Sequence, residues 1–357
     1  MTDIFKTIVI GAGVIGASVA YHLSRFKERV LVIDKGFLTE GTSSATQGWV
    51  WVHTKQPSSY AELSMYSAEL YKGLKKDLSV EFELNRTGGL SLIFEKEKLN
   101  EIEDLIERQE EKGINIKLLT PNEVLKKEPE VNKNIVGATY SQLDGHINPF
   151  RLVRSLIEGS IKNNVEFSFY KQVVNIKKLE NDLYEVISEK GSFLTEQVVL
   201  AGGPWSLEIG KLLNIDIPLK LVKGQILVTE PLRPFLRHIV SGVRQTNNGE
   251  ILIGYSKEEK GLERETSFNI IGETARYAQK IIPKLEDVNI VRTFAGIRSV
   301  PEDGLPIIGE VPGNKGCYLA VTHSGITLAP IIGVLMSEVL RGKTTSLPID
   351  NYNISRF

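Results

Sequence analysis

Three glycines in an apolar run near the start of the chain restrict its fold more strongly than any other feature. The run covers residues 7–23 and reads TIVIGAGVIGASVAYHL. Residues 7–10 are mostly β-branched, and the apolar residues from 17 to 23 recur at helical spacing, which predicts a strand, a tight turn and a helix. A membrane span needs about 20 mostly apolar residues without such interruptions, so we expect no transmembrane segment.

The glycines follow the pattern G-x-G-x-x-G, with Gly11, Gly13 and Gly16 at the three positions. The first glycine permits a tight turn, the second lets a pyrophosphate approach the backbone, and the third lets the helix pack closely on the strand. The next apolar run ends at Asp34, 18 residues after Gly16, where an acid is expected to bind ribose hydroxyls. This context predicts a dinucleotide site, and the fingerprint alone leaves NAD and FAD both open.

Charge and composition exclude several other classes of protein. The chain has 357 residues, enough for about two domains, with 43 Lys and Arg against 44 Asp and Glu, a balance that disfavours nucleic-acid binding. The single cysteine, Cys317, excludes an internal disulfide, and we find no secretory signal pattern, so we expect a cytoplasmic protein. The five histidines show no metal-ligand spacing, and no metal site is predicted.

The later segments differ from the opening unit in their predicted secondary structure. Strand-like runs begin at residues 88, 135, 219 and 249, with a charged helix expected over 97–112, which suggests an antiparallel α+β layer. Glycine-rich segments after residues 197 and 294 interrupt this layer and are expected to converge on one site. We therefore predict two interleaved domains.

Several segments together resemble the D-amino-acid oxidase superfamily of FAD-dependent oxidoreductases. In order from residue 7 to about 340, they are IVIGAGVIGASVAYHL, GTSSATQG, DGHINP, VVLAGGPWS, AGIRSVPEDGLPIIG and THSGITLAP. Within the superfamily they look most like glycine oxidase, sarcosine oxidase and the small subunits of opine and proline dehydrogenases. The resemblance implies an α/β and α+β fold, with a Rossmann-like FAD-binding domain over 1–82, 145–215 and 292–357. An antiparallel-sheet substrate-binding domain would cover 83–144 and 216–291.

The resemblance also places the cofactor on particular residues. The positions that match the family's FAD contacts are Gly11, Gly13, Val14, Ile15, Gly16, Asp34, Lys35, Thr42, Ser43, Gln47, Gly48, Trp49, Val173 and Gly202. The family's segment at the flavin pyrimidine ring matches His323, Ser324, Gly325, Ile326, Thr327 and Leu328, where a helix N-terminus would stabilise negative charge on the flavin. Cys317 lies about 19 residues after the segment that carries a covalent attachment in sarcosine oxidases, so we expect noncovalent FAD.

Three residues are candidates for catalysis. Arg298 matches the family's carboxylate-binding arginine, and a planar guanidinium suits that task. His323 is either an acid–base group or, as we favour, a structural histidine. Ser241 lies near the position where glycine oxidase has a carboxylate-binding tyrosine, and Tyr255 on the following strand would replace it. Trp51, in the segment WVWVH, is either a pocket wall or part of a half-buried strand.

The function implied by the resemblance is FAD-dependent oxidation of the C–N bond of a small amino or imino acid. The candidates are glycine, sarcosine, proline, a D-amino acid or an opine, with hydride transfer to flavin N5 giving an imine. The electron acceptor is oxygen or, as the resemblance to small dehydrogenase subunits favours, a quinone, a dye or a partner subunit. A homo- or hetero-oligomeric state is left open. The alternative is a non-catalytic or electron-relay flavin subunit of a larger dehydrogenase. An NAD-dependent dehydrogenase would not explain GTSSATQG and HSGITL.

Overall fold

The computed structural model describes residues 4–357 and contains two eight-stranded sheets and a short two-stranded one. The first sheet consists of β1 (Ile4–Ile10), β2 (Val30–Ile33), β8 (Glu166–Ser168), β9 (Val173–Lys178), β10 (Tyr184–Ser188), β11 (Gly191–Leu200), β17 (Ile307–Glu310) and β18 (Cys317–Val321). The second consists of β4 (Gly89–Ile93), β5 (Lys117–Leu119), β6 (Gly137–Ser141), β12 (Leu219–Thr229), β13 (Ile239–Val240), β14 (Val243–Gln245), β15 (Ile251–Gly254) and β16 (Ile290–Pro301). The short sheet pairs β3 (Trp49–Val50) with β7 (Gly145–His146).

The first sheet has a parallel centre with the strand order β17-β18-β11-β1-β2-β8. The central strand β1 pairs in parallel with β2 on one side and with β11 on the other, and β11 pairs in parallel with β18. Parallel strands end at the same edge of a sheet, so the loops after β1, β2, β11 and β18 meet there. The predicted βαβ opening is confirmed.

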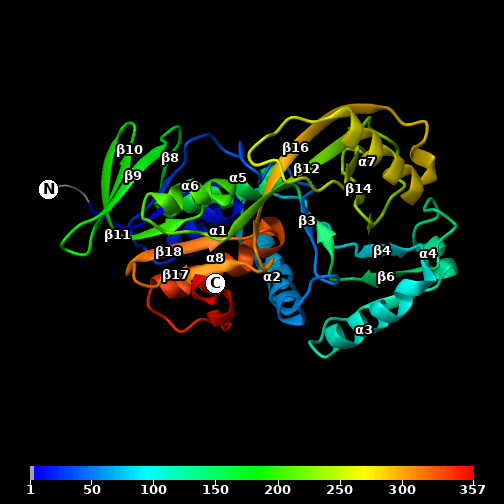
Figure 1. Cartoon of the computed structure of the whole chain (residues 1–357), viewed down its shortest axis with the longest axis horizontal. Helices are drawn as coiled ribbons and strands as arrows, with labels where there is room; N and C mark the ends of the chain where they lie inside the picture. Colours follow the sequence, from blue (N-terminus) through cyan, green and yellow to red (C-terminus); the bar gives the residue numbers. More distant parts are fainter. Residues whose placement is uncertain (1–3) are drawn as a thin grey trace.

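Eight helices cover the sheets in the described part of the chain. They are α1 (Val14–Ser24), α2 (Ser58–Asp77), α3 (Leu99–Glu110), α4 (Pro121–Lys127), α5 (Pro149–Lys162), α6 (Ser206–Lys211), α7 (Phe268–Ile281) and α8 (Gly325–Leu340). Figure 1 places α1, α5, α6 and α8 with the first sheet and α3, α4 and α7 with the second, and β3 lies between the two groups.

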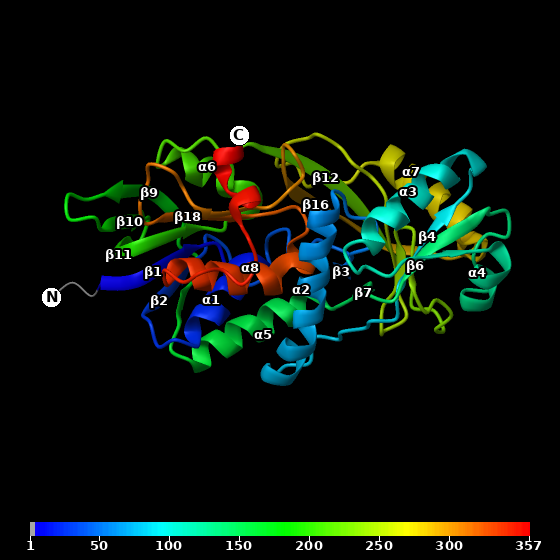
Figure 2. The same ribbon diagram turned by 90° about the horizontal axis from the view of Figure 1, so that it is seen from below.

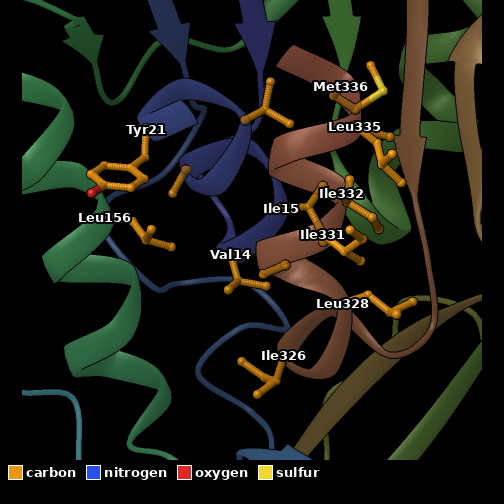
Figure 3. Packing of buried hydrophobic residues seen from close by; sticks show 14 of the residues in the cluster. Val14, Ile15, Tyr21, Leu156, Ile326, Leu328, Ile331, Ile332, Leu335 and Met336 are labelled. Carbon is orange, nitrogen blue, oxygen red and sulfur yellow. The ribbon is translucent and has the colours of Figure 1, made fainter. Parts of the chain in front are cut away.

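Helix α1 is apolar because protein surrounds it on all sides. All eleven of its residues are buried, and it packs between α5 and α8 beneath the first sheet (Figure 2). Side chains such as Val14 and Ile15 meet Ile331 and Ile332 of α8 in one cluster (Figure 3). The membrane-like composition of residues 7–23 therefore reflects burial in a protein core.

Helix α8 contains an interior proline, and a tyrosine replaces the backbone hydrogen bond that the proline cannot make. Pro330 has no N–H to donate to the carbonyl of Ile326, four residues earlier. The Tyr71 hydroxyl on α2 donates a hydrogen bond to that carbonyl instead. Because both groups are buried, the bond satisfies an acceptor that water does not reach. It joins α2 to the beginning of α8.

The second sheet is antiparallel except where β13 pairs with β4. Its longest contact is the pairing of β12 with β16, which runs from Leu219–Pro301 to Thr229–Ile290. Residues 292–301 thus belong to the second sheet, whereas the predicted FAD-binding domain included all residues from 292 to 357. The twelve-residue strand β16 connects the two halves of the molecule, and no change in composition marks where one half ends. The domain limits remain a prediction.

Among residues 4–357, no helix combines the length and the apolarity that crossing a bilayer requires.

The bond between Tyr71 and α8 gives a stability prediction. We expect Tyr71→Phe to lower the free energy of unfolding by about 1–3 kcal/mol, because it leaves the buried carbonyl of Ile326 without a donor. Urea titration measures this, with Tyr66→Phe as the control, since Tyr66 lies on the same helix and is 42% exposed. Adding Pro330→Ala should restore part of the loss by returning a backbone N–H. Equal stability of the two tyrosine variants would contradict this role.

Candidate functional site

An elongated cavity of about 590 Å³ lies at the edge of the first sheet where β1, β2, β11 and β18 end. Of the predicted cofactor residues, those that line it are Gly11, Gly13, Val14, Ile15, Asp34, Lys35, Thr42, Ser43, Val173, Gly202, His323, Gly325 and Ile326. Those that do not line it are Gly16, Gln47, Gly48, Trp49, Ser324, Thr327 and Leu328. The fold thus brings segments from both ends of the chain to one cavity.

The glycine-rich turn leaves no space for side chains. Gly11 has φ +111°, and a Cβ there would lie 2.5 Å from the carbonyl oxygen of Ala201 on the neighbouring loop. A Cβ at Gly16 would lie 1.9 Å from the carbonyl oxygen of Gly11. The first glycine therefore permits the turn, and the third lets α1 approach it closely, as the motif requires.

The N-terminus of α1 faces the cavity without a side-chain cap of its own. Gly13 is the N-cap residue, and the first turn contains no acid. The Val14 N–H donates to Ser43 Oγ at 2.9 Å, which ties the loop after β2 to the helix. Asp34 is held by two backbone donors, Ala12 N at 2.6 Å and Gly36 N at 2.8 Å. A helix N-terminus with no acid in its first turn, next to a fixed carboxylate, suits a phosphate followed by a ribose.

The residues of this cavity fit FAD. The glycine turn and the helix N-terminus form a cradle for a pyrophosphate, and the cavity continues from there to the beginning of α8. Thr322 adds an independent sign, because its hydroxyl oxygen is buried, has no hydrogen-bond partner within residues 4–357, and belongs to a residue of the cavity wall. Buried polar atoms are normally paired, so a ligand atom is expected here.

Sequence reasoning missed several residues of the cavity wall. Trp205 lies between two cations, with Lys35 Nζ 4.1 Å and the Arg264 guanidinium carbon 5.1 Å from its ring centroid. Burial lowers the pKa of Lys35. Trp205 falls in the segment GGPWS. An aromatic residue directly after this glycine turn was the available sequence signal.

The loop before β3 rests on the second sheet. Thr42 Oγ1 donates to the carbonyl of Ile297 at 2.6 Å, beside Arg298. The Gln47 side-chain amide donates to the carbonyls of Gly242 at 2.7 Å and Leu252 at 3.2 Å. Both amide hydrogens of Gln47 are therefore used within the protein, so its side chain positions the loop.

Helix α8 is joined to the same loop through Thr327. Its hydroxyl donates to the carbonyl of Trp49 at 3.2 Å and accepts from the Trp51 N–H at 3.1 Å. Because Thr327 lies in the first turn of α8, these bonds align the start of the helix with β3. This is a positioning contact, and the residue itself does not line the cavity.

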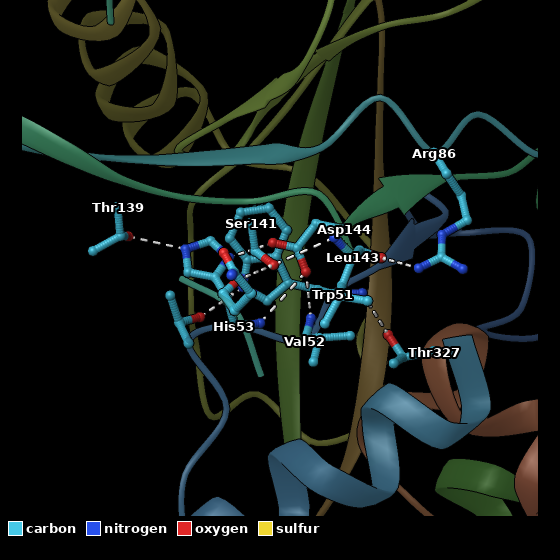
Figure 4. Close-up of polar contacts among 11 residues, drawn as sticks. Trp51, Val52, His53, Arg86, Thr139, Ser141, Leu143, Asp144 and Thr327 are labelled. Atoms are coloured by element: carbon cyan, nitrogen blue, oxygen red, sulfur yellow. Dashed lines mark hydrogen bonds and ion pairs between the residues drawn. The ribbon is translucent and has the colours of Figure 1, made fainter. Parts of the chain in front are cut away.

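A buried ionisable pair fixes the segment that follows β3, and the sequence analysis did not predict this pair. His53 and Asp144 are both fully buried and joined through His53 Nδ1 (Figure 4). Asp144 also accepts from the Val52 N–H at 2.6 Å, and His53 Nε2 bonds to Thr139 Oγ1 at 2.9 Å. Asp144 begins the segment DGHINP, so an acid at the start of a matched motif was the available sequence signal.

Arg298 has a guanidinium that meets no carboxylate. It projects from β16 across Gly224 of β12, where a Cβ would lie 2.3 Å from Nη2. Nη1 donates to the carbonyl of Ser256 at 3.2 Å, and no acid within residues 4–357 forms an ion pair with it. Desolvation lowers the pKa of Arg298.

His323 is neutral. Burial lowers its pKa to about 3, and the positive charges of Lys55, Arg298 and Lys257 lower it further. The side chain is nevertheless exposed, because its ring lines the cavity, and the desolvation comes from the protein atoms that form the cavity around it. Lys55 Nζ donates to Ser324 Oγ, which lies 3.1 Å from His323 Nδ1. Either atom of this pair can be the donor, and the neutral imidazole carries its proton on Nε2 when Ser324 donates to Nδ1.

Arg298 does not line the cavity, although its neighbour Ser299 does, and the remaining candidates also lie outside the lining. Tyr255 is 55% exposed and stacks on Tyr277, with ring centroids 4.0 Å apart. The Ser241 hydroxyl accepts the Leu92 N–H at 2.8 Å. Trp51 Nε1 donates to Thr54 Oγ1 at 2.6 Å. The structure thus gives Ser241 a role inside the second sheet, while the catalytic assignment of Tyr255 stays a prediction.

Cys317 is buried in β18 among apolar side chains, where desolvation raises the pKa of its thiol to about 12. It does not belong to the cavity wall. No cluster of potential metal ligands occurs in the part of the chain that the structure describes.

The parallel sheet, the glycine turn and the elongated cavity define a dinucleotide-binding protein of the Rossmann type. The chain belongs to the family described as DAO, FAD dependent oxidoreductase, whose profile matches residues 6–339. The choice of FAD over NAD and the prediction of an oxidoreductase are thereby confirmed.

Individual relatives match over nearly the whole chain. One subunit of the opine oxidase of Rhizobium meliloti is 30% identical over 355 residues, which cover 96% of this chain and 95% of that protein. The crystal structure of glycine oxidase from Geobacillus kaustophilus superposes with a TM-score of 0.94 at 25% identity and covers 100% of both chains. That of L-proline dehydrogenase from P. horikoshii has a TM-score of 0.93 at 26% identity and covers 100% of this chain and 98% of its own.

The buried pair behind β3 gives a second prediction. We expect Asp144→Ala to lower the free energy of unfolding by about 3 kcal/mol or more, because it leaves His53 and two backbone N–H groups without their acceptor. Asp77→Ala is the control, since its ion pair with Arg25 is exposed and is expected to contribute less than about 1 kcal/mol. Equal losses in chemical denaturation would refute this role for the pair.

The neutral state of His323 gives a third prediction. Its folded pKa of about 3 lies below the ordinary value of 6.5, so the unfolded chain binds the proton first. The stabilising contribution is therefore complete above pH 6.5 and declines as the pH falls towards 3. In NMR spectra of the histidine ring protons, the signal that is missing from His323→Asn should not shift between pH 8 and 5. A titration midpoint near 6.5 would show that the cavity does not keep His323 neutral.

Proposed function

We propose that this protein oxidises the C–N bond of a small amino or imino acid whose carboxylate binds to Arg298. The observation that carries the proposal is the Arg298 guanidinium itself, which is half-buried, donates to one backbone carbonyl and has no acidic partner within residues 4–357. Buried charges are normally paired, so an anion is expected to complete the site. A carboxylate matches the planar guanidinium with two parallel hydrogen bonds.

The surroundings of Arg298 suit a substrate anchor. Its bond to the Ser256 carbonyl and its contact with Gly224 orient the group and leave other N–H donors free. Arginine stays charged at neutral pH despite the lowered pKa. A bound carboxylate would fix the α-carbon in one orientation, and such positioning accounts for a large part of many enzymatic rate accelerations.

The cofactor would be held by the glycine turn, the N-terminus of α1, Asp34 and the cavity wall around Thr322. When bound, the flavin supplies the redox chemistry, because its oxidised ring accepts a hydride equivalent from a carbon next to nitrogen. The imine product would hydrolyse in water after release. Noncovalent binding agrees with the buried position of Cys317.

The charges around His323 favour a neutral substrate amine. Arg298, Lys55 and Lys257 act together on this residue, and positive charges lower the pKa of any ammonium group bound beside them. An amine that binds without its extra proton has a free lone pair to assist oxidation of the C–N bond. No side-chain base is then required, and the neutral His323 would serve as a hydrogen-bond donor through Nε2.

The relatives support an amino or imino acid as substrate without selecting one. The opine oxidase protein, glycine oxidase and L-proline dehydrogenase are similar to this chain over nearly all of its length. The first of them is named as one subunit of its enzyme, which favours a partner protein that receives electrons in place of oxygen. We place the enzyme in the cytoplasm because a single buried cysteine suits a reducing compartment.

A second candidate function follows from the same relative. A flavin subunit of a larger dehydrogenase would relay electrons, with the substrate oxidised elsewhere. Such a protein would have no need of a carboxylate anchor, so Arg298 variants would leave the activity of the complex unchanged.

Substitution of Arg298 tests the proposal. With whichever amino acid reduces the flavin, we expect Arg298→Met to lower kcat/KM by about 100-fold or more, because two charge-assisted hydrogen bonds are lost at about 1.5–3 kcal/mol each. Arg298→Lys should recover only part of the loss. Arg292→Met is the matched control, since Arg292 lies on the same strand and is exposed. An Arg298→Met enzyme with unchanged kcat/KM would favour the electron-relay function.

A further inference from the structure

Residues 256–267, which we call the strap, reach from the second sheet to the cofactor cavity. Between residues 213 and 298, all of which the structure describes, Arg264 of the strap is the one residue that lines this cavity. Its guanidinium Nη1 donates to the Glu40 carbonyl at 3.1 Å, and its guanidinium carbon lies 5.1 Å from the centroid of the Trp205 ring. Both partners belong to the first half of the molecule, so Arg264 joins the strap to that half.

Buried side chains of β12 hold the two ends of the strap. Near its start, Lys223 and Glu258 exchange two backbone hydrogen bonds, at 2.7 and 2.9 Å, and their side chains form an ion pair at 3.7 Å. At its end, Gln225 Oε1 accepts from the Ser267 N–H at 2.9 Å. Lys223 and Gln225 are both buried, whereas residues 259–265 between these anchors are exposed. The strap therefore has a fixed base and an exposed middle that carries Arg264.

The charge of Arg264 has no acidic partner. Its guanidinium forms no ion pair within residues 4–357, and its bond to the Glu40 carbonyl leaves other N–H donors for a ligand. Lys35 Nζ lies 4.1 Å from the centroid of the same Trp205 ring. Desolvation lowers the pKa of Lys35, and the positive charge of Arg264 acts in the same direction. An anion bound beside both cations would relieve their repulsion.

The position of Arg264 matches the phosphate end of the cofactor site. Glu40, which accepts its hydrogen bond, lies three residues before Ser43, whose hydroxyl accepts the Val14 N–H in the first turn of α1. One short loop thus holds both Arg264 and the helix N-terminus at the same cavity. That N-terminus is equivalent to about half a positive charge, which is less than a pyrophosphate requires. The first turn of α1 contains no basic side chain that could supply the rest.

We propose that Arg264 binds the pyrophosphate of the cofactor from the second half of the molecule, so that cofactor binding closes the strap onto the first half. A guanidinium matches two phosphate oxygens with parallel hydrogen bonds, which adds a charge-assisted contact to the bonds that Arg264 already makes. The inference goes beyond the proposed function, because it concerns cofactor binding and requires no particular substrate.

Titration of the FAD-free full-length protein with FAD, followed by flavin fluorescence, tests the binding role. We expect Arg264→Met to raise the Kd for FAD about 10-fold or more, because a charge-assisted contact is lost. Arg264→Lys should recover only part of the affinity, since lysine keeps the charge without the planar fork. Lys260→Met is the matched control, because Lys260 is an exposed cation of the same strap and does not line the cavity. ADP, which has the pyrophosphate and no flavin, should lose affinity by the same factor as FAD.

Limited proteolysis with a glutamyl endopeptidase tests closure of the strap. Glu259 and Glu263 are exposed cleavage sites in its middle, and the exposed Glu111 at the end of α3 serves as an internal reference. Saturating FAD should slow cleavage at the two strap sites severalfold in the wild type and in Lys260→Met, because a closed strap opens less often. In Arg264→Met, FAD at a concentration that saturates this variant should give no such protection.

The outcomes distinguish this inference from its alternatives. Unchanged FAD affinity and unchanged protection in Arg264→Met would overturn it, and equal losses in Arg264→Met and Lys260→Met would show a general electrostatic attraction instead. Weaker binding of FAD with unchanged binding of ADP would place Arg264 on the flavin half of the cofactor. Neither measurement uses an amino acid, so a protein that binds FAD through Arg264 and oxidises no amino acid keeps this inference and loses the proposed function. A protein that binds no FAD contradicts both.

Discussion

The close packing of α1 against the turn that follows β1 determines where everything else in the site lies. With Gly16 in contact with the Gly11 carbonyl, the helix begins directly above the edge of the parallel sheet. Its N-terminus therefore points into the cavity, and its apolar sides are buried between α5 and α8. Because α8 packs along α1, the beginning of α8 is brought to the other end of the same cavity.

From this frame the polar contacts connect the two halves of the molecule. Thr42 and Gln47 tie the loop before β3 to the second sheet, and Thr327 ties β3 to α8. The cofactor cradle and the strand that carries Arg298 are consequently held by the same loop. The cavity has a fixed carboxylate at Asp34, and the half-buried Arg298, which has no acidic partner, lies next to Ser299 of the cavity wall. One end thus suits a ribose and the other an anionic substrate.

The fold could be predicted well where short-range patterns decide the structure. The glycine turn, the strands near 88, 135, 219 and 249, and the helix within 97–112 follow from spacing and β-branched runs, and the structure has them. The long strand β16 was harder to assign, because its residues read alike whichever sheet they join. Contacts between distant segments left no local signal. The Asp144–His53 pair joins residues 91 apart, and the link between Lys55 and Ser324 spans 269.

An anaerobic absorbance titration of the purified protein would show whether this chain oxidises an amino acid through a bound flavin. We expect an oxidised-flavin spectrum that is bleached by at least one compound among glycine, sarcosine, proline, D-amino acids and opines. Readmission of air would then show whether oxygen accepts the electrons. A protein that takes up FAD and is bleached by none of these compounds would contradict amino-acid oxidation on this chain. One that shows no flavin after reconstitution would contradict the cofactor site itself.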